Sequence, residues 1–291
     1  MNLTRLFKPK SIAVIGGGEW CKSIMSAAHQ IGYEGTILPI HPSGKEIAGV
    51  KSLKSLEAFP GLIDAAFVGV NRHATLDIVS KLRTLNAGGA TCFASGFSEA
   101  AAEDAIGANL QEKLVKAAGD MPILGPNCYG FLNAFDKCSI WPDQHGCREV
   151  DRGVAVLTQS SNIAINITMQ NRGLPIGYMI TCGNQAQTSQ ADVALHLLDD
   201  PRITSIGLHI EGFGNLRNWE KLARKAHQKN IPIIVLKSGK SQQAKSAAIS
   251  HTATITGSDV GAQAFLDRLG IRRAENLPVF LEVLKLNHQF G

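Results

Sequence analysis

Short runs of aliphatic and β-branched residues alternate along the chain with longer amphipathic stretches. In the first half these runs predict strands at Ser11–Gly16, Thr36–Ile40, Ala65–Val70, Gly89–Ala94 and Met121–Leu124. The second half repeats the pattern and predicts strands at Gly153–Leu157, Gly177–Thr181, Ser205–Ile210 and Pro232–Lys237, with a short one near Gly270–Arg272. Strands that alternate with helix-length segments are typical of parallel sheets covered by helices, so the pattern predicts a doubly wound α/β protein.

A polar, aperiodic segment at residues 133–152 interrupts this alternation, and we place a domain boundary there. The 291 residues suffice for two domains, expected at residues 1–135 and 150–291. The second domain should contain five strands and be flavodoxin-like. Because ligands of such sheets bind at the carboxyl ends of the strands, functional residues are expected in the loops that follow the strands.

Composition excludes several classes of protein. A chain that is 44% hydrophobic and 18% charged is not disordered, and its 29 glycines lack the period of collagen. We expect neither a membrane span nor a secretion signal, because no apolar run reaches about 18 residues and the start MNLTRLFKPK is polar. The six cysteines lack metal-site spacing, which indicates a reduced, cytoplasmic protein without a metal. The scattered net charge of +5 fits an anionic small molecule better than a nucleic acid.

A glycine run follows the first predicted strand and has the chemistry of a phosphate-binding turn at a helix N-terminus: Gly16, Gly17 and Gly18. The run does not match a dinucleotide fingerprint, because Cys21 occupies the position of the last small residue. Beyond the second strand, Pro42 and Lys45 stand where a ribose-binding carboxylate is expected. A cation there suits NADP or coenzyme A (CoA). A tight turn with a solvated lysine is the structural alternative.

Polar residues also follow the other predicted strands of the first half. Asn71 lies in VGVNRH, Ser95 and Gly96 lie in CFASGFSEA, and Asn127 lies in the turn LGPN. Each loop alone is ordinary. Their expected convergence on one edge of the sheet indicates a binding site.

The second half places a second candidate anion site at Ser160 and Ser161, where a predicted strand meets an amphipathic helix. Self-capping of that helix is the alternative. His251 lies among small hydroxylic residues in SAAISHTATITGSDV, and Glu211 ends the third strand of the same sheet. A carboxylate, an imidazole and a helix N-terminus together suit a phosphohistidine, although a simple surface loop would also explain His251. His209, within a predicted strand, is expected to have a structural or surface role.

The motifs SIAVIG, LPIHP, ASGFSEA, GPNCYGFLN, TQSS, GNQA, IEG, LKSG and SHTATITGSD occur in this order over nearly the whole chain. In that order they resemble the α-subunit, or α-like half, of the NDP-forming acyl-CoA synthetases, which are related to the succinyl-CoA synthetase α-subunit. LKSG and HTATITGSD are more similar to the ADP-forming, acetate-type enzymes.

The resemblance implies a Rossmann-like CoA-binding domain followed by a flavodoxin-like ligase domain. It assigns the CoA contacts to Gly16, Gly17, Gly18, Pro42, Lys45, Asn71, Ser95, Gly96 and Asn127, and it places Cys128 beside the CoA thiol. It assigns phosphate binding to Ser160, Ser161 and Asn162. His251 is then the residue phosphorylated, and Glu211 holds it.

The same resemblance implies that the chain is one component of an acid–thiol ligase that converts a small carboxylic acid, CoA and ATP into acyl-CoA, ADP and phosphate. An acyl phosphate and a phosphohistidine are the expected intermediates. ATP, ADP and Mg²⁺ would bind to an ATP-grasp subunit or domain, for which this sequence shows no motif, and an oligomer is expected.

Two departures from the family pattern stand out. Ser161 and Asn162 occupy the place where relatives usually carry glycine, and GGGEW replaces a GAS-type loop. These departures favour the alternative of a CoA-binding regulatory module without phosphoryl transfer, whereas His251, which related protein lysine acetyltransferases have lost, favours an enzyme. An NADP-dependent oxidoreductase is disfavoured by the failed fingerprint.

Overall fold

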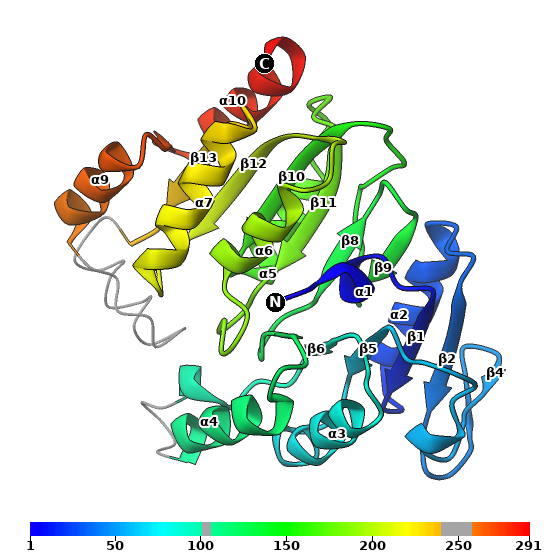
Figure 1. Ribbon diagram of the computed structural model, residues 1–291. Coiled ribbons are helices and arrows are strands. Elements are labelled where there is room, and N and C mark those ends of the chain that lie inside the picture. The colour runs from blue at the N-terminus through cyan, green and yellow to red at the C-terminus, as the bar shows by residue number, and fades with distance from the viewer. Residues whose placement is uncertain (101–105, 240–257) are drawn as a thin grey trace.

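The structure, a computed structural model, describes residues 1–100, 106–239 and 258–291 and contains two α/β units packed against each other (Figure 1). The first unit has a five-stranded parallel sheet in the order β2-β1-β5-β6-β7. Its strands are β1 (Ser11–Ile15), β2 (Thr36–Ile40), β5 (Ala65–Val68), β6 (Ala90–Cys92) and β7 (Ile123–Leu124). Every strand expected in the first half is therefore confirmed. A small hairpin of β3 (Glu46–Ile47) and β4 (Val50–Lys51) follows β2.

Helices cover both faces of the first sheet. One face packs on α3 (Arg72–Thr84) and α4 (Ile106–Ala118). The other face packs on α1 (Thr4–Phe7) and α2 (Glu19–Gln30). Short 3-10 turns lie at Leu56–Ala58 and Ser98–Ala100. The predicted doubly wound arrangement is thus present.

The second unit has a seven-stranded sheet in the order β14-β13-β12-β10-β11-β8-β9. Its parallel strands are β10 (Gly153–Thr158), β11 (Ile176–Thr181), β12 (Ile203–Ile210), β13 (Ile233–Lys237) and β14 (Arg272–Ala274). The helices α5 (Ser161–Thr168) and α10 (Leu277–Phe290) pack on one face, and α6 (Gln190–Leu197), α7 (Leu216–Gln228) and α9 (Asp259–Arg268) pack on the other.

The five strands predicted for the second half are all present, but the sheet has seven strands where five were expected. Two further strands, β8 (Phe131–Asn133) and β9 (Cys138–Ile140), form a hairpin that pairs antiparallel with the edge of β11. The hairpin lies mostly in the segment that the sequence pattern left without structure. Its strands are only three residues long and include the buried polar residues Asn133 and Ser139, so no local hydrophobic period marks them. Pairing with β11, which is distant in sequence, makes them strands.

The two units share a continuous hydrophobic core. Phe7 of α1 lies 5.1 Å, ring centroid to centroid, from Phe131 of β8 and 6.3 Å from Tyr178 of β11. Figure 1 shows α1 beside the β8–β9 hairpin, between the two sheets. Because burial of apolar surface is the main stabilising term, this shared core keeps the two sheets in a defined arrangement.

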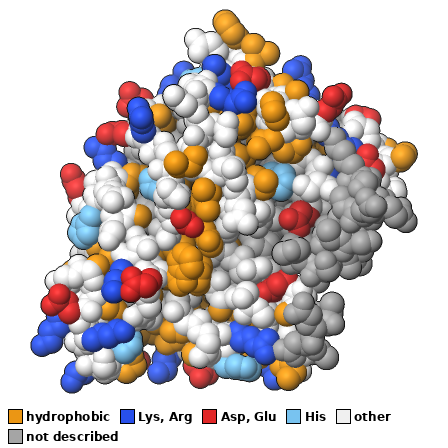
Figure 2. All heavy atoms as spheres, turned by 180° about the vertical axis from the view of Figure 1, so that it is seen from behind, with side chains coloured by type: hydrophobic (Ala, Val, Ile, Leu, Met, Phe, Trp, Pro, Cys, Tyr) orange, Lys and Arg blue, Asp and Glu red, His pale blue; other side chains and the backbone are white. Residues whose placement is uncertain are grey.

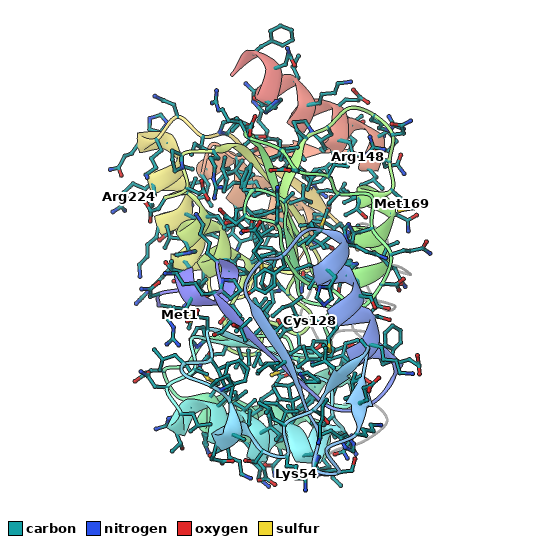
Figure 3. All side chains as sticks on the ribbon, turned by 90° about the vertical axis from the view of Figure 1, so that its right-hand side faces the viewer. Met1, Lys54, Cys128, Arg148, Met169 and Arg224 are labelled. Atoms are coloured by element: carbon teal, nitrogen blue, oxygen red, sulfur yellow. The ribbon has the colours of Figure 1, made fainter. Side chains whose placement is uncertain are left out.

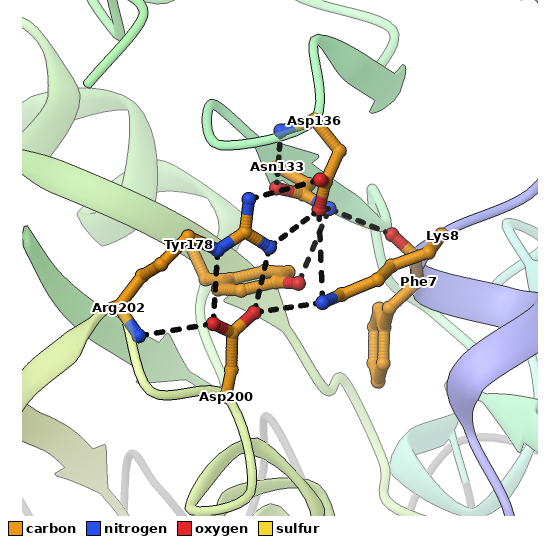
Figure 4. Close-up of polar contacts among 7 residues, drawn as sticks. All are labelled: Phe7, Lys8, Asn133, Asp136, Tyr178, Asp200 and Arg202. Carbon is orange, nitrogen blue, oxygen red and sulfur yellow. Dashed lines mark hydrogen bonds and ion pairs between the residues drawn. The ribbon is translucent and has the colours of Figure 1, made fainter. Parts of the chain in front are cut away.

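An ion network reinforces the same junction (Figure 4). The carboxylate of Asp200 accepts hydrogen bonds from Nε and Nη2 of Arg202, at 2.9 and 2.7 Å, and from Nζ of Lys8, at 2.8 Å. Arg202 also donates to both carboxylate oxygens of Asp136, at 2.9 and 2.8 Å. Asn133 joins the network by donating to the carbonyl of Phe7 and to Asp136. The network therefore ties the N-terminal segment to the hairpin and to the start of β12. We refer to Lys8, Asp136, Asp200 and Arg202 as the junction network.

The surface mixes charges of both signs. Figure 2 shows lysine, arginine, aspartate and glutamate side chains interspersed with hydrophobic ones over the face seen from behind. Among the described residues, no helix has the length and hydrophobicity needed to cross a membrane.

Candidate functional site

A cleft of about 970 Å³ opens where the carboxyl ends of the strands of both sheets meet. Cys128 is one of its lining residues, and Figure 3 shows this side chain between the two units. Of the residues singled out from the sequence, the cleft brings together Asn71, Ser95, Asn127, Ser160, Ser161, Asn162 and Glu211. Gly16, Gly17, Gly18, Pro42, Lys45 and Gly96 do not line it. His251 lies outside the described residues.

The glycine run forms a tight turn between β1 and α2. Gly16 has a φ of +131°, and a Cβ there would lie 2.5 Å from the carbonyl oxygen of Gly69. Lys45 Nζ donates to the carbonyl oxygen of Gly17 at 2.7 Å, so the predicted cation does lie on this turn. Gly18 is the N-cap of α2 and has open space where a side chain would be. The turn thus combines close backbone approach, a helix N-terminus and an ammonium group, which suits an anionic ligand.

The other loops of the first unit are held by local hydrogen bonds. The side chain of Asn71 caps α3 by accepting from the backbone N–H groups of His73 and Ala74. Gly96 has a φ of +91°, and its carbonyl accepts from Nη1 of Arg72 at 2.8 Å. Asn127 adopts a φ of +58°, and its backbone N–H donates to the carbonyl of Ala94 at 3.0 Å. These contacts present the loops as a preformed wall of the cleft.

The start of α5 forms the opposite wall. Ser160 is the N-cap of this helix, and its Oγ accepts from the backbone N–H of Ile163 at 3.4 Å. The capping alternative considered for Ser160 is thus realised. Capping by one hydroxyl leaves the electrostatic character of the helix N-terminus, which attracts anions, in place. Ser161 and Asn162 form the first turn of the helix and also line the cleft.

Gln159 positions the loop of Glu211, a role that the sequence did not reveal. Its Oε1 accepts from the backbone N–H of Glu211 at 2.6 Å and from that of Gly212 at 3.4 Å. The amide side chain of Gln159 is buried, so this bond links the end of β10 to the end of β12 in a defined geometry. Glu211 thereby lines the same cleft as Ser160.

A buried histidine links three strand ends. His209 is 4% exposed, and its Nδ1 lies 2.9 Å from Oγ1 of Thr158 while its Nε2 lies 2.7 Å from Oγ of Ser238. Thr158 Oγ1 in turn accepts from the backbone N–H of Ser160 at 3.0 Å. Burial lowers the pKa of His209 to about 4, so the ring is neutral at pH 7. We refer to Thr158, His209 and Ser238 as the histidine relay.

The structural role expected for His209 is thus more specific than the sequence indicated. The register pairs Thr158 directly with His209 across β10 and β12. The signal in the sequence is a hydroxyl residue directly after each of the two predicted strands that flank Ser205–Ile210, namely Thr158 and Ser238.

The cysteines near the cleft lack the lowered pKa of nucleophilic cysteines. All six cysteines of the chain are free thiols, and Cys92, Cys128 and Cys182 are buried. Burial raises the pKa of Cys92 to about 12 and that of Cys128 well above its ordinary value. Cys128 borders the cleft as a small apolar side chain.

Two protein-family models match the chain. Residues 10–134 match a CoA binding domain, and residues 151–287 match the succinyl-CoA ligase like flavodoxin domain. The fold and the cleft therefore define a protein with a CoA-binding domain and a succinyl-CoA ligase-like domain, whose facing loops enclose one site.

Known relatives narrow this class. An ADP-forming acetate–CoA ligase of Methanocaldococcus jannaschii is 31% identical over 97% of this chain and 39% of its own length. The α-subunit of ADP-forming acetate–CoA ligase I of Pyrococcus furiosus is 30% identical over 94% of this chain and 61% of its own length. A trans-feruloyl-CoA synthase from an unknown prokaryote is 27% identical over 98% of this chain and 41% of its own length.

A solved structure agrees with these relatives. A Korarchaeum cryptofilum acetyl-CoA synthetase, solved with phosphate and ADP, superposes with a TM-score of 0.87 at 26% identity, covering 99% of this chain and 62% of that one. The chain therefore belongs to the ADP-forming acyl-CoA synthetase family and corresponds to its α-subunit or α-like part. It spans between 39% and 62% of the length of these proteins. The relatives support the enzyme hypothesis, not the regulatory module.

Proposed function

We propose that this chain is the CoA-binding and phosphoryl-carrying component of an ADP-forming acyl-CoA synthetase. The complete enzyme would convert a carboxylic acid, CoA and ATP into acyl-CoA, ADP and phosphate. The observation that carries the proposal is the single cleft, to which the CoA-binding unit contributes Asn71, Ser95 and Asn127 and the ligase-like unit contributes Ser160 and Glu211. An acyl group on CoA and a phosphoryl group could therefore meet in one place.

The residues of the first unit fit CoA. The turn of Gly16, Gly17 and Gly18, with Lys45 Nζ on it, would hold the anionic part of CoA by backbone N–H groups and one positive charge. The thiol end would extend along the cleft past Asn71 and Ser95 to Asn127. CoA supplies the thiol that accepts the acyl group, and the chain orients it.

The residues of the second unit fit phosphoryl transfer. The N-terminus of α5 would stabilise the negative charge of phosphate by its dipole and by the hydroxyls of Ser160 and Ser161. Glu211 would accept a hydrogen bond from one ring nitrogen of His251 so that the other nitrogen is available to attack phosphorus. The neutral histidine relay supports this wall without adding charge.

The complete enzyme requires a nucleotide site. We propose that ATP, ADP and Mg²⁺ bind to an ATP-grasp subunit or domain, consistent with the share of the relatives' length that this chain leaves uncovered. We also propose residues 1–135 and 150–291 as the two functional domains, in line with the family models that match residues 10–134 and 151–287. We further propose an oligomeric enzyme and a cytoplasmic location.

Phosphoryl transfer is tested by labelling. The chain together with its ATP-grasp partner, γ-labelled ATP and Mg²⁺ should acquire an acid-labile, base-stable label that His251→Ala abolishes. His227→Ala is the matched control, because His227 lies exposed on α7. Equal labelling of His251→Ala and wild type would disprove the phosphohistidine.

CoA binding is tested separately by calorimetry on the chain. CoA should bind, and NADP should not. Tight NADP binding without CoA binding would overturn the assignment of the first unit.

A further inference from the structure

Three aromatic side chains form one wall of the cleft. Trp20 comes from the first turn of α2, Phe93 follows β6, and Tyr129 follows β7; all three line the cleft. The ring centroids of Trp20 and Phe93 lie 5.2 Å apart, those of Phe93 and Tyr129 5.9 Å and those of Trp20 and Tyr129 6.0 Å. The planes are tilted by between 33° and 48°. We call Trp20, Phe93 and Tyr129 the aromatic wall.

A second layer of rings holds this wall in place. Phe67 lies 5.5 Å from Phe93, and Trp141 lies 5.6 Å from Tyr129 in an edge-on arrangement, centroid to centroid. Both backing rings are fully buried. The wall is therefore preorganised, so a ligand that contacts it need not order it first.

The indole of Trp20 faces this packed cluster and yet Trp20 is 44% exposed. The other two tryptophans of the chain, Trp141 and Trp219, are 0% and 1% exposed. Exposed aromatic surface within a cleft that also presents convergent polar groups is a recognised feature of small-molecule sites.

The position of the wall assigns it to one end of the ligand. The glycine turn and Lys45, which fit the anionic part of CoA, do not line the cleft. Tyr129 directly follows Asn127 and Cys128 in the chain, and the same cleft continues to Ser160 and Glu211. The aromatic wall thus lies in the part of the site where, under the proposed function, the thiol and the carboxyl group react.

We propose that the aromatic wall binds the acyl group of the substrate and that the substrate is an aromatic carboxylic acid. This inference rests on the proposed function. A methyl or short alkyl chain would cover only a fraction of three tilted rings, whereas a planar aromatic group can make offset and edge contacts with them at the distances aromatic pairs prefer. The cleft volume of about 970 Å³ accommodates such a ring in addition to the arm of CoA.

The test compares three ligands by calorimetry on the chain: CoA, acetyl-CoA and benzoyl-CoA. We expect benzoyl-CoA to bind at least about tenfold more tightly than acetyl-CoA, since each aromatic contact adds to the burial of the ring. Trp20→Ala should remove this preference and leave the affinities for CoA and acetyl-CoA within about twofold of wild type, which would show that the CoA site itself is intact. Phe290→Ala is the matched control, because Phe290 is an exposed aromatic residue at the end of α10.

Trp20 itself provides a second readout. As the exposed tryptophan, it should dominate fluorescence quenching by acrylamide, and benzoyl-CoA should protect it more than acetyl-CoA does. Trp20→Leu keeps an apolar side chain without a ring and should lose the preference as Trp20→Ala does.

Two outcomes overturn the inference without affecting the proposed function. Equal affinity of wild type for acetyl-CoA and benzoyl-CoA would show that the aromatic wall does not bind the acyl group selectively. An equal loss of affinity for all three ligands in Trp20→Ala would show that the indole contacts CoA itself. If CoA and both of its thioesters fail to bind wild type, the proposed function fails and this inference fails with it.

Discussion

Replacement of Asp200 by asparagine should destabilise the protein through the junction network. The Asp200 side chain is 5% exposed and accepts from both Arg202 and Lys8. Breaking a buried ion pair costs about 3–5 kcal/mol, because it leaves charges without their partner. Lys8 and Arg202 are partly exposed and keep Asp136 nearby, at 3.9 and 2.8 Å, so the lower end applies and we expect a loss of about 3 kcal/mol in the free energy of unfolding.

The neighbouring residue Asp199 provides a matched control. Its carboxylate pairs with Lys225 at 2.6 Å and with Lys229 at 3.0 Å, but its side chain is 58% exposed. Exposed ion pairs contribute about 0–1 kcal/mol to stability, so Asp199→Asn should change the free energy of unfolding very little. The two variants make the same chemical change one residue apart and differ in burial.

The assay is urea unfolding of wild type and both variants, followed by far-ultraviolet circular dichroism. At pH 7 we expect the midpoint of Asp200→Asn to fall clearly and that of Asp199→Asn to stay near wild type. In thermal unfolding the loss corresponds to roughly 6–12 °C for a chain of this size class. Ordinary surface substitutions change the free energy of unfolding by about 0.5 kcal/mol. If the two variants differ in their free energy of unfolding by no more than this amount, the role of the junction network is refuted.

The pH dependence has a definite sign. The partners of Asp200 and Asp136 hold the pKa of both carboxyl groups below its usual range. A lowered folded-state pKa contributes stability above the unfolded-state pKa of about 3.9, and that stability is lost as the pH falls below it. The difference in the free energy of unfolding between wild type and Asp200→Asn should therefore be largest at pH 7 and should decrease toward pH 3. A difference that grows as the pH falls would contradict this linkage.

The remaining predictions concern the cleft. Glu211→Gln should reduce phosphoryl labelling of the enzyme in the presence of its ATP-grasp partner, because the carboxylate acts on the phosphoryl side of the cleft. The affinity for CoA, measured by calorimetry, should stay unchanged. A parallel loss of CoA affinity would argue against this division of the cleft. His209→Leu removes both hydrogen bonds of the His209 ring. The Thr158 hydroxyl keeps its hydrogen bonds to Ser160, whereas the Ser238 hydroxyl loses its ring partner, so we expect about 1–3 kcal/mol of destabilisation in urea unfolding. An unchanged midpoint would show that the histidine relay does not stabilise the protein. The methyl group of Gly18→Ala has room, so thermal stability should stay near wild type. Because the turn is proposed to contact CoA, the same methyl group should weaken CoA binding at least severalfold. Gly16→Ala, which would meet the carbonyl of Gly69, should instead lower the melting temperature, and a neutral result would contradict the tight turn.

The sequence alone determined the local elements and the family. Runs such as Ser11–Ile15 and Gly153–Thr158 are buried along their whole length, and a buried parallel strand is marked by its own hydrophobic residues. The loops that follow the strands were predictable for the same reason, since strand ends determine which residues reach the edge of the sheet. Asn71, Ser95, Asn127, Ser160 and Glu211 were found in this way.

Only the tertiary structure decided which of these loops share a site and what lies between them. The β8–β9 hairpin exists because it pairs with β11, and the junction network joins residues up to 192 positions apart. His209 acquires its function as a link only through Thr158 and Ser238 on neighbouring strands. The aromatic wall combines rings from the first turn of α2 and from the segments that follow β6 and β7. Contacts between residues distant in sequence leave no period or spacing in the chain, because they are selected by packing in three dimensions.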